Sequence, residues 1–473
     1  MAQSARMLPC HHAVGGLVGQ PYRSCYGRFL SLHARSSLFD SRTGAFDPGN
    51  WVFSPEWWGT QGCGWGRNPG TTVFEQPSHK GNGLVSVTAH PASSSGLEDW
   101  PELSKLLQGR QVTSCEWRVL RFNHETRQSV AKVVVVEGQD YEEPYLVQVP
   151  SCLAFEYLKS MVSVGLSSIN CAGLNLELVA QGKSKMRCLC IGLGGGSLPL
   201  FLANKLQGCF MEVVEIDKTV ISAATECMGF PKNAFKVLQQ SDHGLSLRNA
   251  LESSFVQEGL GIQRHSYAKY TNDVSHTASS LWGKLPDRII GVEADGVAYV
   301  RNLLKDIGLK GQHYDLAFID AYDGKDDVPS GFWNRGGPFL TGLRDLLNPH
   351  HGTAVVNLHT DSLPPSFLER IRGEFGPGFD PHLPGGKQLQ EISQMYRDEL
   401  LWCQRHSNAL KGAAFTVAVP RQQNICLVVS RGIIGMKSCI VQNLTSAACY
   451  LERVLDIPFP MSKRVARGFK LVP

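Results

Sequence analysis

The feature that most restricts the fold of this chain is a run of glycines between an apolar strand and an apolar helix. In CLCIGLGGGSLPLF these two elements are separated by Gly192, Gly194, Gly195 and Gly196. Glycine has no Cβ, so such a loop can approach a ligand closely, and the unpaired N–H groups of the following helix favour a carboxylate or phosphate. Pro199 lies in the first helical turn, where its missing N–H has no cost. The pattern predicts a strand–loop–helix unit that binds a ligand.

An acidic residue downstream makes this prediction more specific. Glu215 lies 19 residues after Gly196, at the end of a second apolar strand in VVEID. A carboxylate at that place can accept both hydrogen bonds of a ribose diol. No GK[ST] follows the loop, which disfavours Walker-type phosphate binding. The alternative is a tight glycine turn with a solvated glutamate at a strand end.

Strand and helix patterns alternate along much of the remaining chain. After the glycine loop, RIIGVEAD, YDLAFID and GTAVVNLHT are strand-like, and GVAYVRNLLKDIG and PFLTGLRDLLN are helix-like. AAFTVAVP and NICLVVS predict a closing antiparallel hairpin. Upstream, CEWRVLRF, AKVVVVEG and PYLVQVP predict a small antiparallel β unit of about three strands. The expected fold class is therefore α/β, a Rossmann-like doubly wound sheet preceded by that unit.

These patterns divide the chain into five predicted segments. They are a disordered or transit-like segment over 1–45, a Trp/Gly-rich extension over 46–110, a small β-rich domain over 111–165, a Rossmann-like domain over 183–435 with an insertion at 243–285, and a tail over 436–473. The extension is interpreted either as a lid over an acceptor or as an aromatic clamp on the main domain. The first 39 residues contain arginines and serines but no Asp, Glu or Lys, which is typical of organelle transit peptides. Plastid or mitochondrion is expected if they are one, and cytoplasm if they are a disordered tail.

Composition excludes some classes of function. The 473 residues are 42% hydrophobic and 19% charged, as in an ordinary globular protein, and no apolar run is long enough to span a membrane. The net charge of +4 comes from 46 basic and 42 acidic side chains without a cationic block, which disfavours nucleic acid as a partner. The 14 cysteines are scattered without a CxxC pair, so reduced thiols are expected. His243, His313 and His359 lack metal-ligand spacing, so no metal is expected.

From about residue 115 to 430 the chain resembles the spermidine-synthase-like branch of class I S-adenosylmethionine-dependent methyltransferases. The matching motifs IGLGGGSLPLF, VVEID, EADGVAYVRN and YDLAFIDAYD occur in the expected order. Within that family the glycine loop is similar to that of the carboxy-terminal domain of a dual methyltransferase of elongation factor 1-alpha. The resemblance implies S-adenosylmethionine in the cleft, and homodimers are frequent in such families.

The same resemblance implies a contact to the adenine ring. Asp295 in EADG would lie beyond the third strand and accept a hydrogen bond from the adenine amino group, with Gly296 beside it. Asp242 in QQSDHG competes for this role, since its spacing from Glu215 fits better. The flanking sequence and the distance to the next strand favour Asp295.

Two carboxylates after the fourth strand are the candidates for catalysis. Asp320 and Asp323 in FIDAYDG follow the strand from which an acceptor is usually addressed, and a carboxylate there can orient an amine and take its proton. The pair also resembles the catalytic Asp of polyamine synthases. Alternatively, an Asp at a strand end caps the next turn. Tyr322 and Trp333 flank the presumed acceptor pocket and either line it or only pack.

Three hypotheses about function remain open. The first is a methyltransferase whose acceptor is an amine of a protein or a small molecule. The second is an aminopropyltransferase of the spermidine synthase type, but those enzymes have an Asp within GGGDGG where Gly195 stands, and a different motif in place of DAYDG. The third is an adenosyl-binding protein without activity, because fold does not dictate function. The acceptor itself is not indicated by the sequence.

Overall fold

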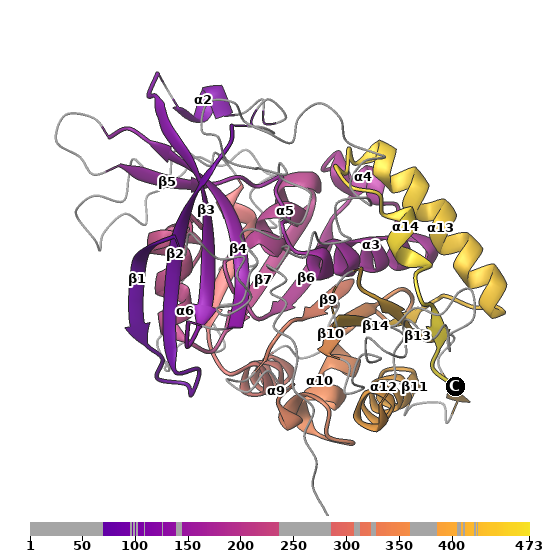
Figure 1. Ribbon diagram of the computed structural model, residues 1–473. Helices are drawn as coiled ribbons and strands as arrows, with labels where there is room; N and C mark the ends of the chain where they lie inside the picture. The colour runs from indigo at the N-terminus through magenta and orange to yellow at the C-terminus, as the bar shows by residue number, and fades with distance from the viewer. Residues whose placement is uncertain are drawn as a thin grey trace, which may run out of the picture.

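The computed structural model describes most of the chain downstream of the Trp-rich region (Figure 1). The described residues are 70–94, 97, 100, 103–107, 109–124, 126–138, 144–235, 285–306, 313–322, 328–359, 386–403, 408–409, 412–420, 422 and 424–473. Several predictions lie outside them: the segment 1–45, the first part of the Trp/Gly-rich extension, nearly all of the insertion, and Asp242, His243 and Asp323.

The centre of the molecule is an eight-stranded mixed sheet, which confirms the predicted fold class. Its order is β15-β13-β14-β10-β9-β6-β7-β8, and β10, β9, β6, β7 and β8 are parallel neighbours, whereas β14 is antiparallel to β10 and β13 to β14. The bounds are β6 Met186–Ile191, β7 Cys209–Glu215, β8 Ile289–Glu293, β9 Leu316–Ile319, β10 Thr353–His359, β13 Gly412–Ala418, β14 Asn424–Arg431 and β15 Lys470–Leu471. The chain order reverses between β6 and β9, the switch point at which sheets of this kind bind ligands.

Alternate residues of each central strand pack on opposite faces of this sheet, because successive side chains in a strand point to opposite sides. On β6, Cys188 and Cys190 belong to one hydrophobic cluster, and Leu189 and Ile191 belong to the other. The first cluster includes residues of α3 (Glu156–Cys171), α5 (Ser197–Lys205) and α13 (Lys437–Val454). The second includes residues of α9 (Gly296–Asp306), α10 (Pro338–Leu346) and α12 (Lys387–Leu400). Both faces of the sheet are therefore covered by helices (Figure 1).

The small β unit is larger than the sequence predicts. It is a five-stranded antiparallel sheet in the order β1-β2-β3-β4-β5, and two of its strands precede residue 111. The bounds are β1 Thr71–Pro77, β2 Leu84–Ala92, β3 Val112–Phe122, β4 Thr126–Val136 and β5 Tyr145–Gln148. Only Phe74 of β1 is buried, so this edge strand lacks the apolar alternation by which a strand is recognised. Trp117, Val119 and Val130 join the core on the α3 face of the large sheet.

Helices also depart from their expected bounds. The sequence predicts a helix over Cys152–Val164, and the observed helix α3 begins four residues later. TVISAATECMGF, which follows VVEID, predicts another helix, and the structure has a short α6 (Lys218–Ser222) that continues into a π-helical turn, η2 (Ala223–Cys227). The remaining short helices are α2 Leu103–Leu107, α4 Leu176–Ala180 and α14 Ser462–Val465; short 3-10 turns are Lys232–Ala234, Pro286–Arg288 and Ser330–Phe332, and a two-stranded pair is Trp402–Cys403 with Asn408–Ala409.

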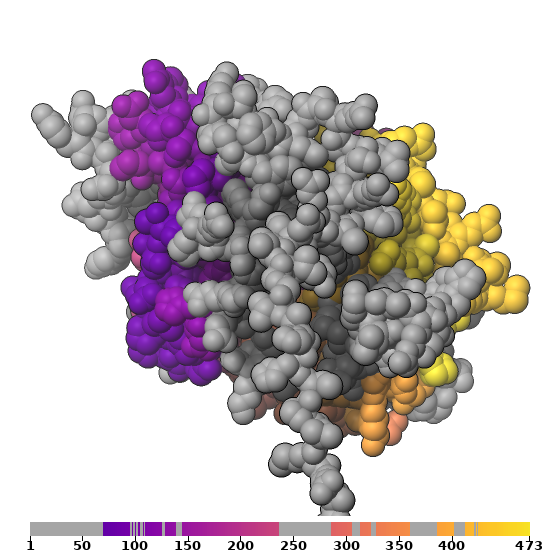
Figure 2. Space-filling view, viewed as in Figure 1, coloured from indigo at the N-terminus to yellow at the C-terminus, as the bar shows by residue number. Residues whose placement is uncertain are grey.

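The predicted tail over 436–473 is a folded part of the main domain. Its helix α13 packs along α3, and β15 pairs with the outer strand β13. Ile440, Leu444, Ala448 and Leu451 recur at helical spacing and are all buried. Figure 2 shows the C-terminal segment and the antiparallel sheet at opposite sides of the face in view.

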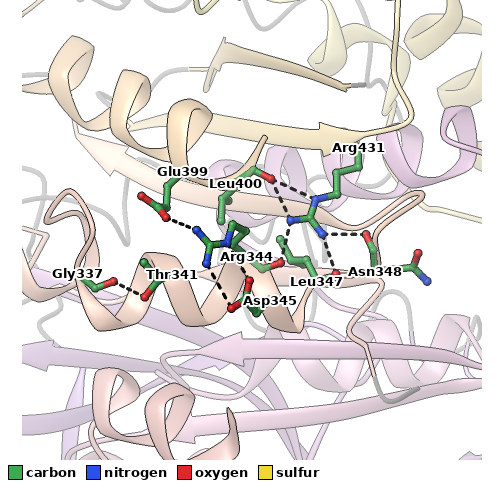
Figure 3. A network of polar contacts seen from close by, with 9 residues as sticks. All are labelled: Gly337, Thr341, Arg344, Asp345, Leu347, Asn348, Glu399, Leu400 and Arg431. Atoms are coloured by element: carbon green, nitrogen blue, oxygen red, sulfur yellow. Dashed lines mark hydrogen bonds and ion pairs between the residues drawn. The ribbon is translucent and has the colours of Figure 1, made fainter. Parts of the chain in front are cut away.

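A buried arginine connects the end of β14 to helices α10 and α12 (Figure 3). Arg431, at the end of β14, donates hydrogen bonds to the carbonyl oxygens of Arg344, Leu347, Asn348 and Leu400 at 2.8–3.2 Å. These carbonyls lie at the C-terminal ends of α10 and α12, where helical partners are missing. The guanidinium therefore supplies hydrogen-bond donors to the carbonyl oxygens at the C-terminal ends of both helices.

Candidate functional site

A cavity of about 460 Å³ opens where the parallel strands of the large sheet end. Its volume is within the usual range for small-molecule sites. Six of the nine predicted site residues line it: Gly192, Gly194, Glu215, Asp295, Gly296 and Asp320. Gly195 and Gly196 belong to the same loop but are not in the lining, and Asp323 lies outside the described residues. The structure thus brings together residues that the sequence predicts from separate motifs.

The glycines of the loop are required by the protein's own packing. Gly192 has φ +97°, and a Cβ there would overlap the backbone oxygen of Asp320. Gly196 has φ +79° at the start of α5, and a Cβ would overlap the ring of Phe230. Phe230 reaches the loop from the segment after the π-helical turn. The loop is therefore fixed between β9 on one side and that segment on the other.

Glu215 ends β7 with its carboxylate at the wall of the cavity. Its Oε2 accepts a hydrogen bond from the Leu193 backbone N–H at 3.0 Å, and its Oε1 accepts one from Asp217 N–H at 2.9 Å. Burial raises the pKa of Glu215, and these backbone bonds partly offset that rise. A carboxylate has about four acceptor positions, so Glu215 can accept further hydrogen bonds from a ligand beside these.

Asp295 lines the cavity beyond β8 and also caps the next helix. Its Oδ1 accepts a hydrogen bond from Ala298 N–H at 2.8 Å in the first turn of α9. The second carboxylate oxygen has no hydrogen-bond partner among the described residues. Gly296 packs against Ile191 and Phe332 so closely that a Cβ would lie 3.0 Å from each. Asp295 therefore combines a structural role with a place in the lining.

Asp320 is the centre of a hydrogen-bond network in the cavity wall next to the glycine loop, called the Asp320 end below. It is the first residue after β9, and its Oδ1 accepts a hydrogen bond from Asn357 Nδ2 at 2.9 Å. The Tyr157 hydroxyl, from the first turn of α3, donates to the Gln128 carbonyl at 3.5 Å and lies close enough to the Asp320 carboxyl group to lower its pKa. Burial raises the pKa of Asp320, and Asn357 and Tyr157 act in the opposite direction. Asn424 Nδ2 in turn donates to Asn357 Oδ1 at 3.0 Å.

Aromatic side chains close this end. Tyr322 donates its hydroxyl to the Asn357 carbonyl at 2.8 Å and stacks on His359 with ring centroids 4.5 Å apart. Both rings line the cavity. Tyr322 therefore takes the first of its two predicted roles, lining the pocket, and His359, the last residue of β10, is a lining residue that the sequence does not predict. Trp333 is absent from the lining and donates its indole N–H to the Val328 carbonyl at 3.1 Å. Its predicted alternative, a packing role, fits this contact.

The antiparallel sheet supplies part of the wall, which the sequence does not predict. Its contribution comes from the β1–β2 turn and from β3 and β4: Lys80, Asn82, Leu120, Phe122, Gln128 and Ser129. The turn is held by the fully buried Asp217, whose Oδ2 accepts hydrogen bonds from Ser78 Oγ at 2.5 Å and Asn82 Nδ2 at 2.9 Å. Asp217 also caps α6 through Thr219 N–H. The one sequence feature that could have indicated this contact is Asp217, a carboxylate two residues after Glu215 at the end of a strand.

Metal and membrane sites have no support in this part of the chain. Among the described residues, no three His, Cys, Asp or Glu side chains are grouped to hold a metal ion. In the same residues, every helix is too short or too polar to cross a lipid bilayer.

Comparison with known proteins gives a partial match in sequence. No protein-family model matches the chain. It is 39% identical over 93 residues to the eEF1A lysine and N-terminal methyltransferase of Xenopus laevis, which covers 20% of this chain and 12% of that protein. The protein of the same name from Homo sapiens is 28% identical over 185 residues, or 37% of this chain and 23% of the relative. The chain thus aligns with less than a quarter of these relatives' length, and the predicted resemblance is confirmed over that stretch.

Solved structures give weaker matches over more of the chain. Human methyltransferase-like protein 13 in complex with SAH has 17% identity and a TM-score of 0.38, covering 64% of this chain and 93% of that structure. A probable spermidine synthase from Corynebacterium glutamicum has 13% identity and a TM-score of 0.36, covering 72% and 86%.

Proposed function

We propose that this protein is an S-adenosylmethionine-dependent methyltransferase that transfers methyl to an amine, with a protein amine as the first acceptor to test. The observation that carries the proposal is one cavity whose lining includes the glycine loop, Glu215 and Asp320 with its partner Asn357. The sequence relatives are eEF1A lysine and N-terminal methyltransferases, which act on amines of a protein.

The first end of the cavity fits an adenosyl donor. Glu215 has free acceptor positions for a ribose diol, and Asp295 has a second carboxylate oxygen for an adenine amino group. Gly194 lets the backbone approach the donor, and the start of α5 favours a carboxylate. When bound, S-adenosylmethionine supplies a methyl carbon activated by the sulfonium: a nitrogen lone pair forms the new N–C bond as the C–S bond breaks.

The other end fits a neutral amine and its departing proton. The Asp320 carboxylate can accept a hydrogen bond from the acceptor nitrogen and then its proton, because the raised pKa makes it a better base than an exposed aspartate. The hydrogen bond from Asn357 holds the carboxylate in one orientation. The stacked rings of Tyr322 and His359 border the site and limit access of water. Alignment of the amine with the methyl carbon then supplies most of the rate enhancement.

The test uses the purified full chain. Calorimetry measures binding of S-adenosylmethionine, and mass spectrometry then measures methyl groups added to purified eEF1A and to lysine-containing peptides. We expect donor binding that is lost in Glu215→Ala, and methylation that depends on both donor and Asp320. Glu293→Ala is the matched control. Glu293 is the last residue of β8 and lies opposite Glu215 in the strand register, but its side chain is exposed and is not part of the cavity lining.

Other outcomes separate the alternatives. Binding of S-adenosylmethionine without methylation of eEF1A rejects this acceptor and keeps the donor site. Preference for decarboxylated S-adenosylmethionine, with transfer to putrescine, would establish the aminopropyltransferase instead. Binding of neither donor contradicts the proposal.

A further inference from the structure

Three charged side chains are buried behind the first turn of helix α3. Glu156 and Lys159 belong to this helix, and Arg464 comes from α14, 308 residues further along the chain than Glu156. Lys159 is 0% exposed, and Glu156 and Arg464 are each 7% exposed. The Glu156 carboxylate accepts hydrogen bonds from Lys159 Nζ at 2.9 Å and from Arg464 Nη2 at 2.7 Å. These three residues form the Glu156 triad, which is not part of the cavity lining.

The charges of the triad are paired with one another. Burial alone would raise the pKa of Glu156, but Lys159 and Arg464 lower it below the usual value of a glutamate. Exchanging a buried ion pair for apolar residues often costs no stability, so such a pair is weak evidence of a stabilising role. It does fix geometry, because a buried charge separates from its partner only at a large cost in free energy. The triad therefore holds the back of this helix turn in one position.

The front of the same turn borders the cavity. The N-cap residue Phe155 and the helical residue Tyr157 line it, whereas Glu156 between them does not. The rings of Phe155 and Tyr157 have their centroids 5.3 Å apart. Tyr157 also lies close enough to the Asp320 carboxyl group to lower its pKa. A shift of the turn would therefore move the cavity wall at the Asp320 end.

The turn depends on contacts from distant parts of the chain. The first four N–H groups of a helix lack partners within it, and Phe155 supplies no side-chain cap to α3. The N–H of Tyr157 donates instead to Gln422 Oε1 at 3.0 Å. Gln422 and Arg464 lie far from α3 in the sequence, so the position of the turn is decided by tertiary contacts.

Arg464 is itself held by its neighbours. Its Nη1 donates to the carbonyl oxygen of Pro460 at 2.7 Å, and its guanidinium lies 5.3 Å from the centre of the Phe459 ring. Phe459 stacks on Phe201 of α5 with ring centroids 5.9 Å apart. The arginine therefore connects the C-terminal segment, which is packed against α5, to the first turn of α3.

We propose that Arg464 is a positioning residue for methyl transfer: through Glu156 it fixes the first turn of α3, and with it Phe155 and Tyr157 at the Asp320 end of the cavity. This inference rests on the proposed function, since it concerns the same reaction. It gives the C-terminal segment 436–473, which contributes no residue to the cavity lining, a role in the rate of that reaction.

The variant that tests this inference is Arg464→Met, with Arg431→Met as the matched control. Glu156 keeps Lys159 as its partner in Arg464→Met, so no buried charge is left unpaired. Arg431 is also a buried arginine that donates to backbone carbonyl oxygens, but these lie at the ends of α10 and α12 and not on α3. Thermal melting of each variant establishes that it is folded.

Hydrogen exchange of the full chain, followed by mass spectrometry, gives a readout that is independent of activity. Peptides that cover residues 155–160 should exchange about tenfold faster in Arg464→Met, as expected for the loss of one hydrogen bond to a charged group. Arg431→Met should leave these peptides unchanged, because helix ends exchange by local opening. Unchanged exchange in Arg464→Met, or equal acceleration in both variants, would overturn the inference.

The second measurement is the rate of methyl transfer at saturating donor as a function of pH. Among the described residues, the titratable groups that face Asp320 are Tyr157 of α3, Cys190 of β6 and Cys426 of β14, and of these Tyr157 lies on the turn. Arg464→Met should move the acid limb of the profile to higher pH, with a rate about tenfold lower on that limb. Donor affinity, measured by calorimetry, should stay within about twofold.

A double variant tests whether the effect passes through Tyr157. Arg464→Met should cause no further shift of the acid limb in a Tyr157→Phe background, because both changes act on the same hydroxyl. Additive shifts would overturn the inference, as would an unchanged profile in Arg464→Met or the same shift in Arg431→Met.

Arg464→Lys decides the question if Arg464→Met does not fold. One ammonium group cannot replace the two guanidinium nitrogens that bind Glu156 and Pro460, so the acid limb should move in the same direction, with a rate about threefold lower. A wild-type profile in Arg464→Lys would then contradict the inference. If the wild type transfers no methyl group, the proposed function itself fails, whereas a normal profile of the variants beside an active wild type contradicts only this inference.

Discussion

The glycine-loop end of the cavity and the Asp320 end differ in how much of the chain each requires. The first end takes its loop and its acid from one unbroken stretch, β6 through Glu215, and the Glu215 carboxylate is bonded to the loop itself through Leu193 N–H. The second end combines Tyr157 of α3, Asn357 of β10 and Asn424 of β14 around Asp320. A local unit can bind a common donor, whereas an assembled unit can be shaped for one acceptor.

The largest effect is expected at the assembled end. Asp320→Asn should reduce the rate of methyl transfer by about 10²–10⁴-fold, the usual contribution of a general base, while donor binding stays within twofold or so. The amide can still accept the Asn357 hydrogen bond. Single-turnover transfer and calorimetry on the same preparation measure the two quantities. Equal loss of both would show that the two ends do not work separately.

The same variant has a defined effect on stability. A carboxyl group whose pKa is raised on folding contributes stability at low pH, and this contribution is lost as the pH rises through the folded-state pKa. At neutral pH the ionised, buried Asp320 is therefore unfavourable, and Asp320→Asn should leave the melting temperature unchanged or raise it. A lower melting temperature at neutral pH would show that Asp320 is retained for structure.

At the local end, Glu215→Ala should weaken S-adenosylmethionine at least about 100-fold, since each hydrogen bond to a charged group is worth roughly 1.5–3 kcal/mol. The acceptor end should be unaffected, so the rate at saturating donor should fall much less. Calorimetry and donor titrations of the rate check this split. Glu293→Ala, at the exposed end of the neighbouring strand, should bind the donor normally.

Arg431 is not part of the cavity lining, so its substitution tests whether donor binding depends only on the residues of the cavity. Arg431→Ala leaves the carbonyl oxygens at the ends of α10 and α12 without donors, and should lower the free energy of unfolding by about 2–3 kcal/mol. Binding of the donor to the folded fraction should not change. Urea unfolding and calorimetry give the two values, and a large loss of affinity would mean that the cavity depends on this distant clamp.

The smallest effect is expected for Tyr157→Phe. Loss of its hydroxyl removes a group that lowers the pKa of Asp320, so that pKa should rise further. The carboxylate is then protonated at higher pH, and the acid limb of the pH–rate profile should move upward, with a rate about tenfold lower on that limb. At high pH the variant should approach the wild type. A uniform loss at all pH values would assign Tyr157 to packing alone.

The large sheet without its edge strand β15, the glycine loop and Glu215 are predictable from the sequence, because they depend on local patterns: apolar periodicity, glycine backbone freedom and a fixed spacing along one βαβ unit. Asp320 was also predictable, as a carboxylate at a strand end. Its partners Tyr157 and Asn357 were not, because they lie 163 residues before and 37 residues after it and nothing local marks them. Strand β1 lacks a recognisable strand pattern because only Phe74 is buried on it. Helix α13 lies in the predicted tail, although its buried residues recur at helical spacing. Only the tertiary structure placed Ser129 beside Gly195, since contacts between two sheets are decided by packing and not by sequence spacing.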